Sequence, residues 1–251
     1  MKKNIITLVV LMSAVFGLMA QNKMIVNLKS GTKVEYAVQN IESVTWEIGE
    51  QPGDQPGDPQ EGEHEFVDLG LPSGLKWATC NVGASAPEEY GDYYAWGEIE
   101  TKDEYYVGNY AYHHIGTDAD GFEIDVWDNL GDISGTEYDV ARHKWGGFWR
   151  MPTQSEFKEL VNNCTWEWGK KNKVNGYKVT GSNGNWIFLP AAGYRGGTDL
   201  YSENMQGYYW SSTSNPSKQG SVFNLLFSSS HIISNNNHGS ANGQSVRPVT
   251  E

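Results

Sequence analysis

The chain has 251 residues, and its 31 acidic and 18 basic side chains give a formal net charge of −13. This charge disfavours nucleic acids and anionic membrane surfaces as partners, because both would repel the protein. The ten tryptophans and fourteen tyrosines can fill a core with few residues, and the twenty-nine glycines indicate many turns and short strands. We therefore expect one large domain with smaller appendages.

Residues 1–20 are predicted to form a secretory signal peptide. Lys2 and Lys3 supply its basic end, an apolar run extends from residue 5 to residue 18, and Ala20 is small enough for cleavage. Because the apolar run is too short to favour a membrane span, we expect no transmembrane segment in the mature chain. The expected location is the periplasm, the cell surface or the medium.

Residues 21–48 are predicted to form a small β segment. Residues 24–38 resemble two strands joined by a turn at Lys29, Ser30 and Gly31, and residues 41–46 suggest a third strand. Residues 49–65 follow as a linker with a tandem QPGD repeat and almost no apolar residue. Proline, glycine and repelling carboxylates predict that this linker is extended and disordered.

The main domain is predicted to extend from residue 66 to residue 251. Its one main helix should begin at Thr153, because Thr153 and Glu156 form a capping box and Phe157, Leu160 and Val161 form an apolar stripe. Short strands are predicted at residues 66–70, 75–80, 93–97, 177–180, 186–189, 208–210, 222–227, 231–233 and 245–247. This pattern predicts an α+β domain of antiparallel strands with a long polar insertion at residues 98–140.

Several long motifs carry a resemblance to a known family. VDLGLPSGLKWATCNVG, EEYGDYYAWGE, WGGFWRMPTQSEFKELV, IFLPAAGYR, YYWSST and GQSVRPV occur in this order within residues 66–249. They resemble the Fibrobacter succinogenes major paralogous domain of exported Bacteroidetes-type proteins. WRMPTQSEF, with WSST and SVRPV behind it, is more distantly similar to formylglycine-generating enzymes and a bacterial adhesin domain. This similarity implies a C-type-lectin-like fold and, by analogy only, a binding function.

The aromatic residues suggest a recognition surface for a glycan or an extracellular protein. Flat rings with polar edges suit sugar and peptide faces. We expect Trp96 and Trp210 to lie in the core, while alternation along strands leaves other rings exposed. The candidate ligand-binding residues are Tyr105, Tyr106, Tyr110, Tyr112, Tyr194, Tyr201 and Tyr208.

Calcium is the one cofactor that the residues suggest. Asp118, Asp120, Glu123 and Asp125 offer oxygen ligands around a turn-forming glycine, although the segment lacks the terminal glutamate of an EF-hand loop. A solvated acidic loop is the alternative interpretation. His113, His114 and His143 lack the spacing of a zinc site, so we expect no transition metal.

The two cysteines, Cys80 and Cys164, are expected to form a disulfide, because export leads to an oxidising compartment and the number of cysteines is even. Two separate buried thiols are the alternative. Formylglycine-generating enzymes use a cysteine pair near the C-terminus, and this chain has none there, so that activity is rejected. An exported recognition module, a hydrolase with its site in residues 98–140 and a structural envelope protein remain as hypotheses.

Overall fold

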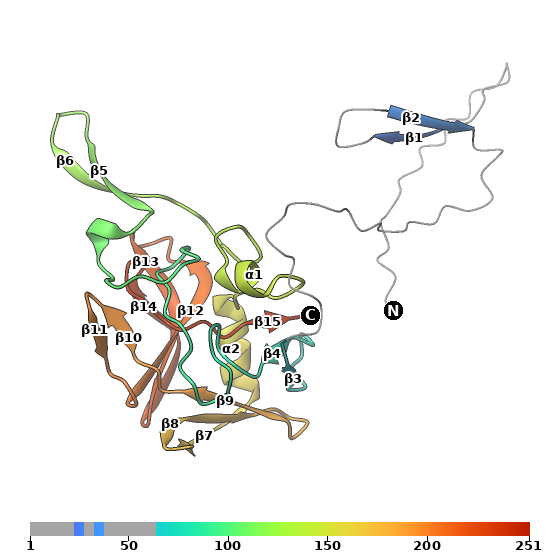
Figure 1. Ribbon diagram of the computed structural model, residues 1–251, viewed down its shortest axis with the longest axis vertical. Coiled ribbons are helices and arrows are strands. Elements are labelled where there is room, and N and C mark those ends of the chain that lie inside the picture. Colours follow the sequence, from blue (N-terminus) through green and yellow to red (C-terminus); the bar gives the residue numbers. More distant parts are fainter. Residues whose placement is uncertain (1–22, 28–32, 38–63) are drawn as a thin grey trace. The chain divides into compact units, whose positions relative to one another are not determined.

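The computed structural model describes residues 23–27, 33–37 and 64–251. The chain divides into two compact units, Met1–Asp54 and Gln55–Glu251. In the first unit, β1 (Lys23–Asn27) and β2 (Lys33–Ala37) pair antiparallel, with Ile25 opposite Glu35 (Figure 1). The antiparallel pairing of the two predicted strands is therefore confirmed, whereas the predicted turn at residues 29–31 lies outside the described residues. The predicted signal peptide, the third strand at residues 41–46 and the linker up to residue 63 lie outside the described residues.

The second unit is an α+β structure of small antiparallel sheets with few helices (Figure 1). Its first strands, β3 (Phe66–Asp68) and β4 (Lys76–Ala78), form a sheet with its last strand, β15 (Val249–Thr250), in the order β15-β4-β3. The beginning and the end of the unit are thus hydrogen-bonded to each other. In the part of the chain that is described, no helix is long and apolar enough to cross a membrane.

Two three-stranded sheets and two hairpins complete the unit. One sheet consists of β7 (Thr165–Lys171), β8 (Val174–Thr180) and β9 (Trp186–Pro190). The other consists of β12 (Gln206–Ser214), β13 (Ser221–Ser228) and β14 (His231–Gly239). The hairpins are β5 (His113–Thr117) with β6 (Glu123–Trp127), and β10 (Tyr194–Gly196) with β11 (Asp199–Tyr201). A 3-10 turn, η2 (Val107–Asn109), precedes β5.

The main helix, α2 (Gln154–Asn163), begins where the sequence predicts. The Thr153 hydroxyl accepts a hydrogen bond from the Glu156 backbone N–H at 3.2 Å, and the Glu156 carboxylate accepts one from the Thr153 N–H at 2.7 Å. Phe157 and Leu160 are both 0% exposed and pack against the β12–β14 sheet. The predicted capping box and apolar stripe are therefore confirmed.

A second helix, α1 (Val140–Trp145), was not expected from the sequence. Asp139 caps it and holds the neighbouring loops: its carboxylate accepts hydrogen bonds from the backbone N–H groups of Ala141, Arg142, Gly135 and Met151. This buried side chain supplies acceptors that the short helix and its loops would otherwise lack.

Several predicted strands need correction. Residues 93–97 are a buried irregular segment with one β-bridge, between Tyr94 and Gln244, and their aromatic rings pack in the core instead of alternating along a ladder. Residues 245–247 likewise have only one bridge, at Ser245, and the final strand is β15. Residues 98–140, a polar insertion in which the sequence predicted no strand, contain the β5–β6 hairpin.

The core consists of three hydrophobic clusters. The first packs α2 against β8, β9 and the β12–β14 sheet. The second brings together Trp96, Trp145 of α1 and Trp210 of β12. Trp96 and Trp210 are 4% and 0% exposed, which confirms both as core residues. The third cluster contains Tyr93, Tyr105 and Tyr110, and it lies beside the cavity described next.

The SVRPV motif has a structural role through Arg247, which is 0% exposed. Its guanidinium donates hydrogen bonds to the Asn81 side chain at 2.8 Å and to the carbonyls of Ala78, Thr79 and Phe188 at 2.7–3.0 Å. Burial lowers the pKa of Arg247, and these acceptors compensate for the loss of hydration. The C-terminal segment is thereby fixed to the end of β4 and to β9.

Candidate functional site

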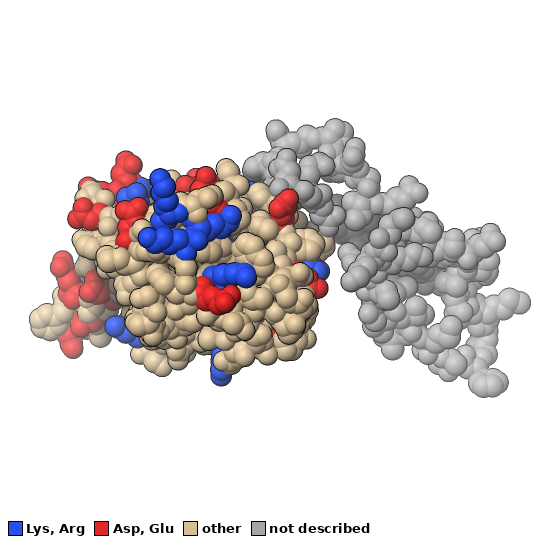
Figure 2. All heavy atoms as spheres, turned by 90° about the horizontal axis from the view of Figure 1, so that it is seen from below, with Lys and Arg blue, Asp and Glu red and all other residues tan. Residues whose placement is uncertain are grey.

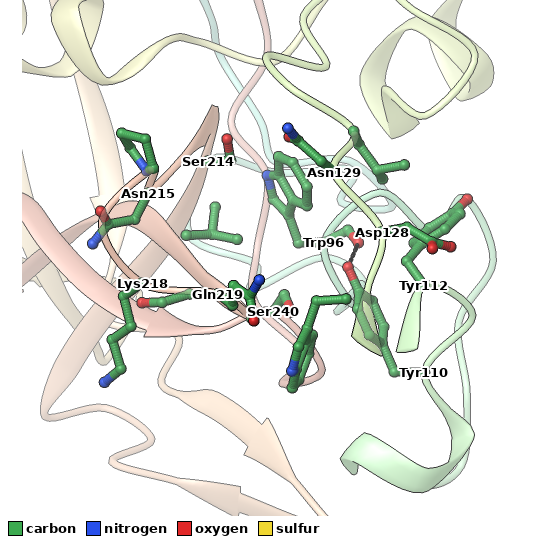
Figure 3. A pocket seen from close by; sticks show the side chains of 16 residues that line it. Trp96, Tyr110, Tyr112, Asp128, Asn129, Ser214, Asn215, Lys218, Gln219 and Ser240 are labelled. Carbon is green, nitrogen blue, oxygen red and sulfur yellow. Dashed lines mark hydrogen bonds between the residues drawn. The ribbon is translucent and has the colours of Figure 1, made fainter. Parts of the chain in front are cut away.

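A cavity of about 280 Å³ lies at the base of the β5–β6 hairpin. One side is formed by residues 127–130 with Tyr110 and Tyr112, and the other by the end of β12, the β12–β13 loop and the start of β13 (Figure 3). Trp96 lies between the two sides. The cavity thus has an aromatic part and a polar rim, which is the usual composition of a small-ligand site.

Hydrogen bonds fix the aromatic part of the cavity. Trp96 Nε1 donates to the Ser211 carbonyl at 2.9 Å, and the Tyr110 hydroxyl donates to the Trp96 carbonyl at 2.7 Å. The Tyr112 hydroxyl donates to the Gly97 carbonyl at 3.0 Å. Burial raises the pKa of both tyrosines, so their hydroxyls stay protonated as donors at neutral pH. These rings are therefore held in place before any ligand arrives.

Trp127, the last residue of β6, positions the loop on the other side of the cavity. Its ring lies 6.0 Å from the Tyr110 ring, centroid to centroid, and rests against Gly220. A Cβ at residue 220 would come within 2.7 Å of the Trp127 ring, and Gly220 has φ +65°, which disfavours other residues. Glycine at this position is what allows the β12–β13 loop to approach the indole.

The rim carries amide, ammonium and carboxylate groups. Asp128 and Asn129 come from the chain after β6, whereas Asn215, Lys218 and Gln219 come from the β12–β13 loop (Figure 3). Asp128 is the only carboxylate among the lining residues. The rim can donate and accept hydrogen bonds, but it lacks the second carboxylate that acid–base hydrolysis of a glycoside requires.

A buried hydroxyl without a hydrogen bond lines the same cavity. Ser240 is 3% exposed, and its Oγ lies beside the Tyr110 phenol without forming a hydrogen bond of ordinary geometry. Buried polar groups are normally paired, so an unpaired one in a cavity wall is a place where a ligand or water would bind.

The structure separates the predicted tyrosines into different environments. Tyr110 and Tyr112 line the cavity, and Tyr106, which is 49% exposed, does not. Tyr110 is only 4% exposed and packs in the third core cluster, so its assignment to the surface is corrected. The prediction that Tyr105 is a surface residue is wrong: it is 2% exposed, because its hydroxyl donates to the Tyr93 carbonyl inside the third core cluster.

The remaining three tyrosines form a separate cluster with His238. The Tyr194 ring lies 5.3 Å from that of Tyr201, 4.8 Å from that of Tyr208 and 4.6 Å from the His238 ring. Tyr201 is 44% exposed, but Tyr208 is only 9% exposed, so its assignment to the surface is corrected. The sequence thus predicted residues of two separate clusters, not one recognition face.

The predicted calcium residues occupy the β5–β6 hairpin without converging. Asp118 Oδ1 accepts hydrogen bonds from the backbone N–H groups of Asp120 and Phe122 at 3.0 and 2.9 Å, so it stabilises the turn. Asp125 Oδ1 lies 2.8 Å from His113 Nε2. Among the described residues, no group of three or more histidine, cysteine, aspartate or glutamate side chains could hold a metal ion. Glu123, paired with Thr117, is at the outer end of the hairpin.

The predicted disulfide is not formed in the structure, where Cys80 and Cys164 are both free. Cys164 is the C-cap of α2 and packs against the first core cluster, and burial raises its pKa to about 11. The Cys80 sulfur lies 3.6 Å from the Thr79 hydroxyl, which can donate to it. The alternative of two separate thiols describes this arrangement better, because each sulfur has its own local surroundings.

Sequence reasoning missed most of the cavity. Its rim residues and Ser240 belong to segments that are distant in sequence, and no motif connects them. The available signals were the polar NPSKQG turn between two apolar strands and the excess of aromatic residues. Comparison with known proteins gave no significant match to a family model, to a curated protein or to a solved structure.

Proposed function

We propose that this protein is an exported, non-catalytic recognition module that binds a glycan in the cavity at the base of the β5–β6 hairpin. The observation that carries the proposal is the composition of this cavity, with four aromatic side chains facing a rim of amide, hydroxyl and ammonium groups. Sugar rings present both C–H faces, which pack on aromatic rings, and hydroxyls, which need donors and acceptors.

The chemistry of the cavity favours binding over hydrolysis. A glycoside hydrolase usually needs two carboxyl groups on opposite sides of the bond that is cleaved, and Asp128 is the only one that lines this cavity. The unpaired Ser240 hydroxyl and the fixed phenols of Tyr110 and Tyr112 favour a preformed binding site. We therefore favour the recognition module over the hydrolase in residues 98–140.

Export, family and detailed fold are part of the same proposal. The signal-like residues 1–20 support export to the periplasm, the cell surface or the medium. The motifs from VDLGLPSGLKWATCNVG to GQSVRPV support membership of the Fibrobacter succinogenes major paralogous domain family. The α+β architecture with one main helix is compatible with a C-type-lectin-like fold. Partners of this module would be glycans or extracellular proteins, not nucleic acids.

A glycan array tests the proposal. Residues 21–251 are labelled and applied to an array that includes neutral, acidic and amino sugars. We expect retention on a limited set of glycans, and we expect loss of that retention for Lys218→Ala combined with Gln219→Ala. Both side chains are exposed, so this variant should fold normally. The proposal would be contradicted if the protein bound no glycan on the array, or if the double variant bound the same glycans as the wild type.

A further inference from the structure

The tip of the β5–β6 hairpin carries apolar side chains that nothing in the described structure covers. Phe122 is 69% exposed, Ile115 57% and Ile124 41%. The same hairpin, residues 113–127, contains four carboxylates and no lysine or arginine. An exposed apolar tip with a strong negative charge is typical of a segment that enters a partner site of opposite charge.

A groove of about 420 Å³ lies on the outer face of the β7–β8–β9 sheet. Strand alternation directs Tyr177 and Val179 into the core, and directs Lys178 to the outer face. Gly169 leaves space on the outer face, because a Cβ at this position would meet no atom within 4 Å. Gly176 lies opposite Gly169, and the Phe188 ring fills the space beside it. The sheet therefore has a hollow in its outer surface.

Aromatic rings and lysines surround this groove. Trp186 is 45% exposed, with the Lys178 ammonium 5.5 Å from its ring centroid, and the Phe188 ring lies against Gly176. Lys170 and Lys171 also line the groove. Figure 2, which views the molecule from the β7–β8 end, shows basic side chains gathered on this face.

The lysines of the groove are only partly neutralised. Lys178 lies 3.8 Å from Glu167 and Lys171 lies 3.2 Å from Glu88, whereas Lys170 forms no ion pair within residues 64–251. In a chain with a net charge of −13, a basic and aromatic groove is therefore a local exception. Its chemistry is complementary to that of the hairpin tip.

We propose that the β5–β6 hairpin of one copy docks into the β7–β8–β9 groove of a second copy. Phe122 would enter beside Trp186 and Phe188, while the carboxylates of the hairpin would meet the lysines of the groove. Figure 1 places the β5–β6 hairpin and the β7–β8–β9 sheet at opposite ends of the domain. Two different surfaces then meet at each contact, so the association is head-to-tail and extends into chains instead of stopping at a symmetric dimer.

Sedimentation velocity over a range of concentrations tests the proposal. Wild-type residues 21–251 should form species larger than dimers as the concentration rises, and the association should weaken when salt is added. Phe122→Ser removes the most exposed apolar side chain of the tip, and we expect it to weaken association by about tenfold or more. Phe148→Ser, at another highly exposed phenylalanine, is the matched control and should associate like the wild type.

A second variant fills the groove without disturbing the core. A Cβ at Gly169 would meet no atom within 4 Å, so Gly169→Leu places its side chain in the open groove. Each variant alone should be monomeric at concentrations at which the wild type already associates. An equimolar mixture should form a complex of two chains and no larger species, because Phe122→Ser retains the groove and Gly169→Leu retains the hairpin.

Three outcomes would overturn the proposal. The first is a wild-type chain that remains monomeric at all accessible concentrations. The second is association that both variants leave unchanged, as contacts through residues 1–54 would produce. The third is a mixture of two monomeric variants that fails to form the complex of two chains. Circular dichroism and the melting curve of each variant separate these outcomes from a failure to fold. Glycan binding is measured independently, so this proposal and the proposed function can fail separately.

Discussion

His238 is surrounded by aromatic rings, and burial lowers its pKa below the ordinary value of 6.5. Its neighbours are Tyr194, Tyr208 and Trp210, none of which offers a negative charge at neutral pH. Its Nδ1 is buried and forms no hydrogen bond. The folded protein therefore favours the neutral imidazole.

This lowered pKa predicts a loss of stability in mild acid. As the pH falls through 6.5, the unfolded chain binds a proton at His238 that the folded chain does not bind, so the free energy of unfolding decreases until the folded pKa is reached. Urea unfolding is measured at about pH 7.5 and about pH 5.5. Between these two pH values the free energy of unfolding should decrease less for His238→Gln than for the wild type. Equal decreases for the two proteins would show that His238 does not titrate in this way.

The two cysteines provide a second test at the scale of single residues. Because Cys80 and Cys164 are free in the structure, both should react when the protein is denatured with an alkylating agent and no reductant. Intact mass should then show two labels. In the folded protein Cys164 should react slowly, because burial raises its pKa to about 11 and leaves little thiolate. An unlabelled denatured chain would mean that the disulfide predicted from the sequence forms after all.

At the scale of elements, helix α2 depends on its cap and on its buried face to different degrees. Thr153→Ala removes one capping hydrogen bond and should lower the free energy of unfolding by about 1 kcal/mol. Phe157→Ala leaves a cavity in the first core cluster and should cost about 3–5 kcal/mol. Denaturant titration compares the two variants. Small and equal losses of unfolding free energy in the two variants would contradict the packing of α2 on the β12–β14 sheet.

The elements that the sequence predicted are those with strong local signals. The α2 capping box and the β8–β9 hairpin around Gly181–Gly184 each lie within a few consecutive residues, and both were found. Helix α1 was missed because its six residues are too few to show a period, and its stability depends on the buried Asp139. Residues 93–97 look like a strand by composition, but their rings are held by long-range packing.

At the scale of the whole molecule, the candidate site could not be predicted because it is assembled from distant segments. Tyr110 and Tyr112 were selected for their aromatic character, and they do line the cavity. Lys218 belongs to a polar turn and Ser240 follows a strand, but only the fold brings the β12–β13 loop and the end of β14 to the base of the hairpin. Composition thus indicated the general type of site, an aromatic recognition site. Its location follows only from the tertiary structure.

The most direct test of the account is calorimetric titration with a glycan that the array selects. The glycan is titrated into the wild-type protein, into Trp127→Ala and into Trp186→Ala. Trp127→Ala removes a wall of the cavity, and Trp186→Ala removes an exposed tryptophan from the separate β7–β8–β9 groove. The account predicts that Trp127→Ala weakens binding by about tenfold or more, corresponding to about 1.4 kcal/mol or more, while Trp186→Ala binds like the wild type. Wild-type affinity in Trp127→Ala, with loss of binding in Trp186→Ala, would place the ligand in the groove and contradict the proposed site.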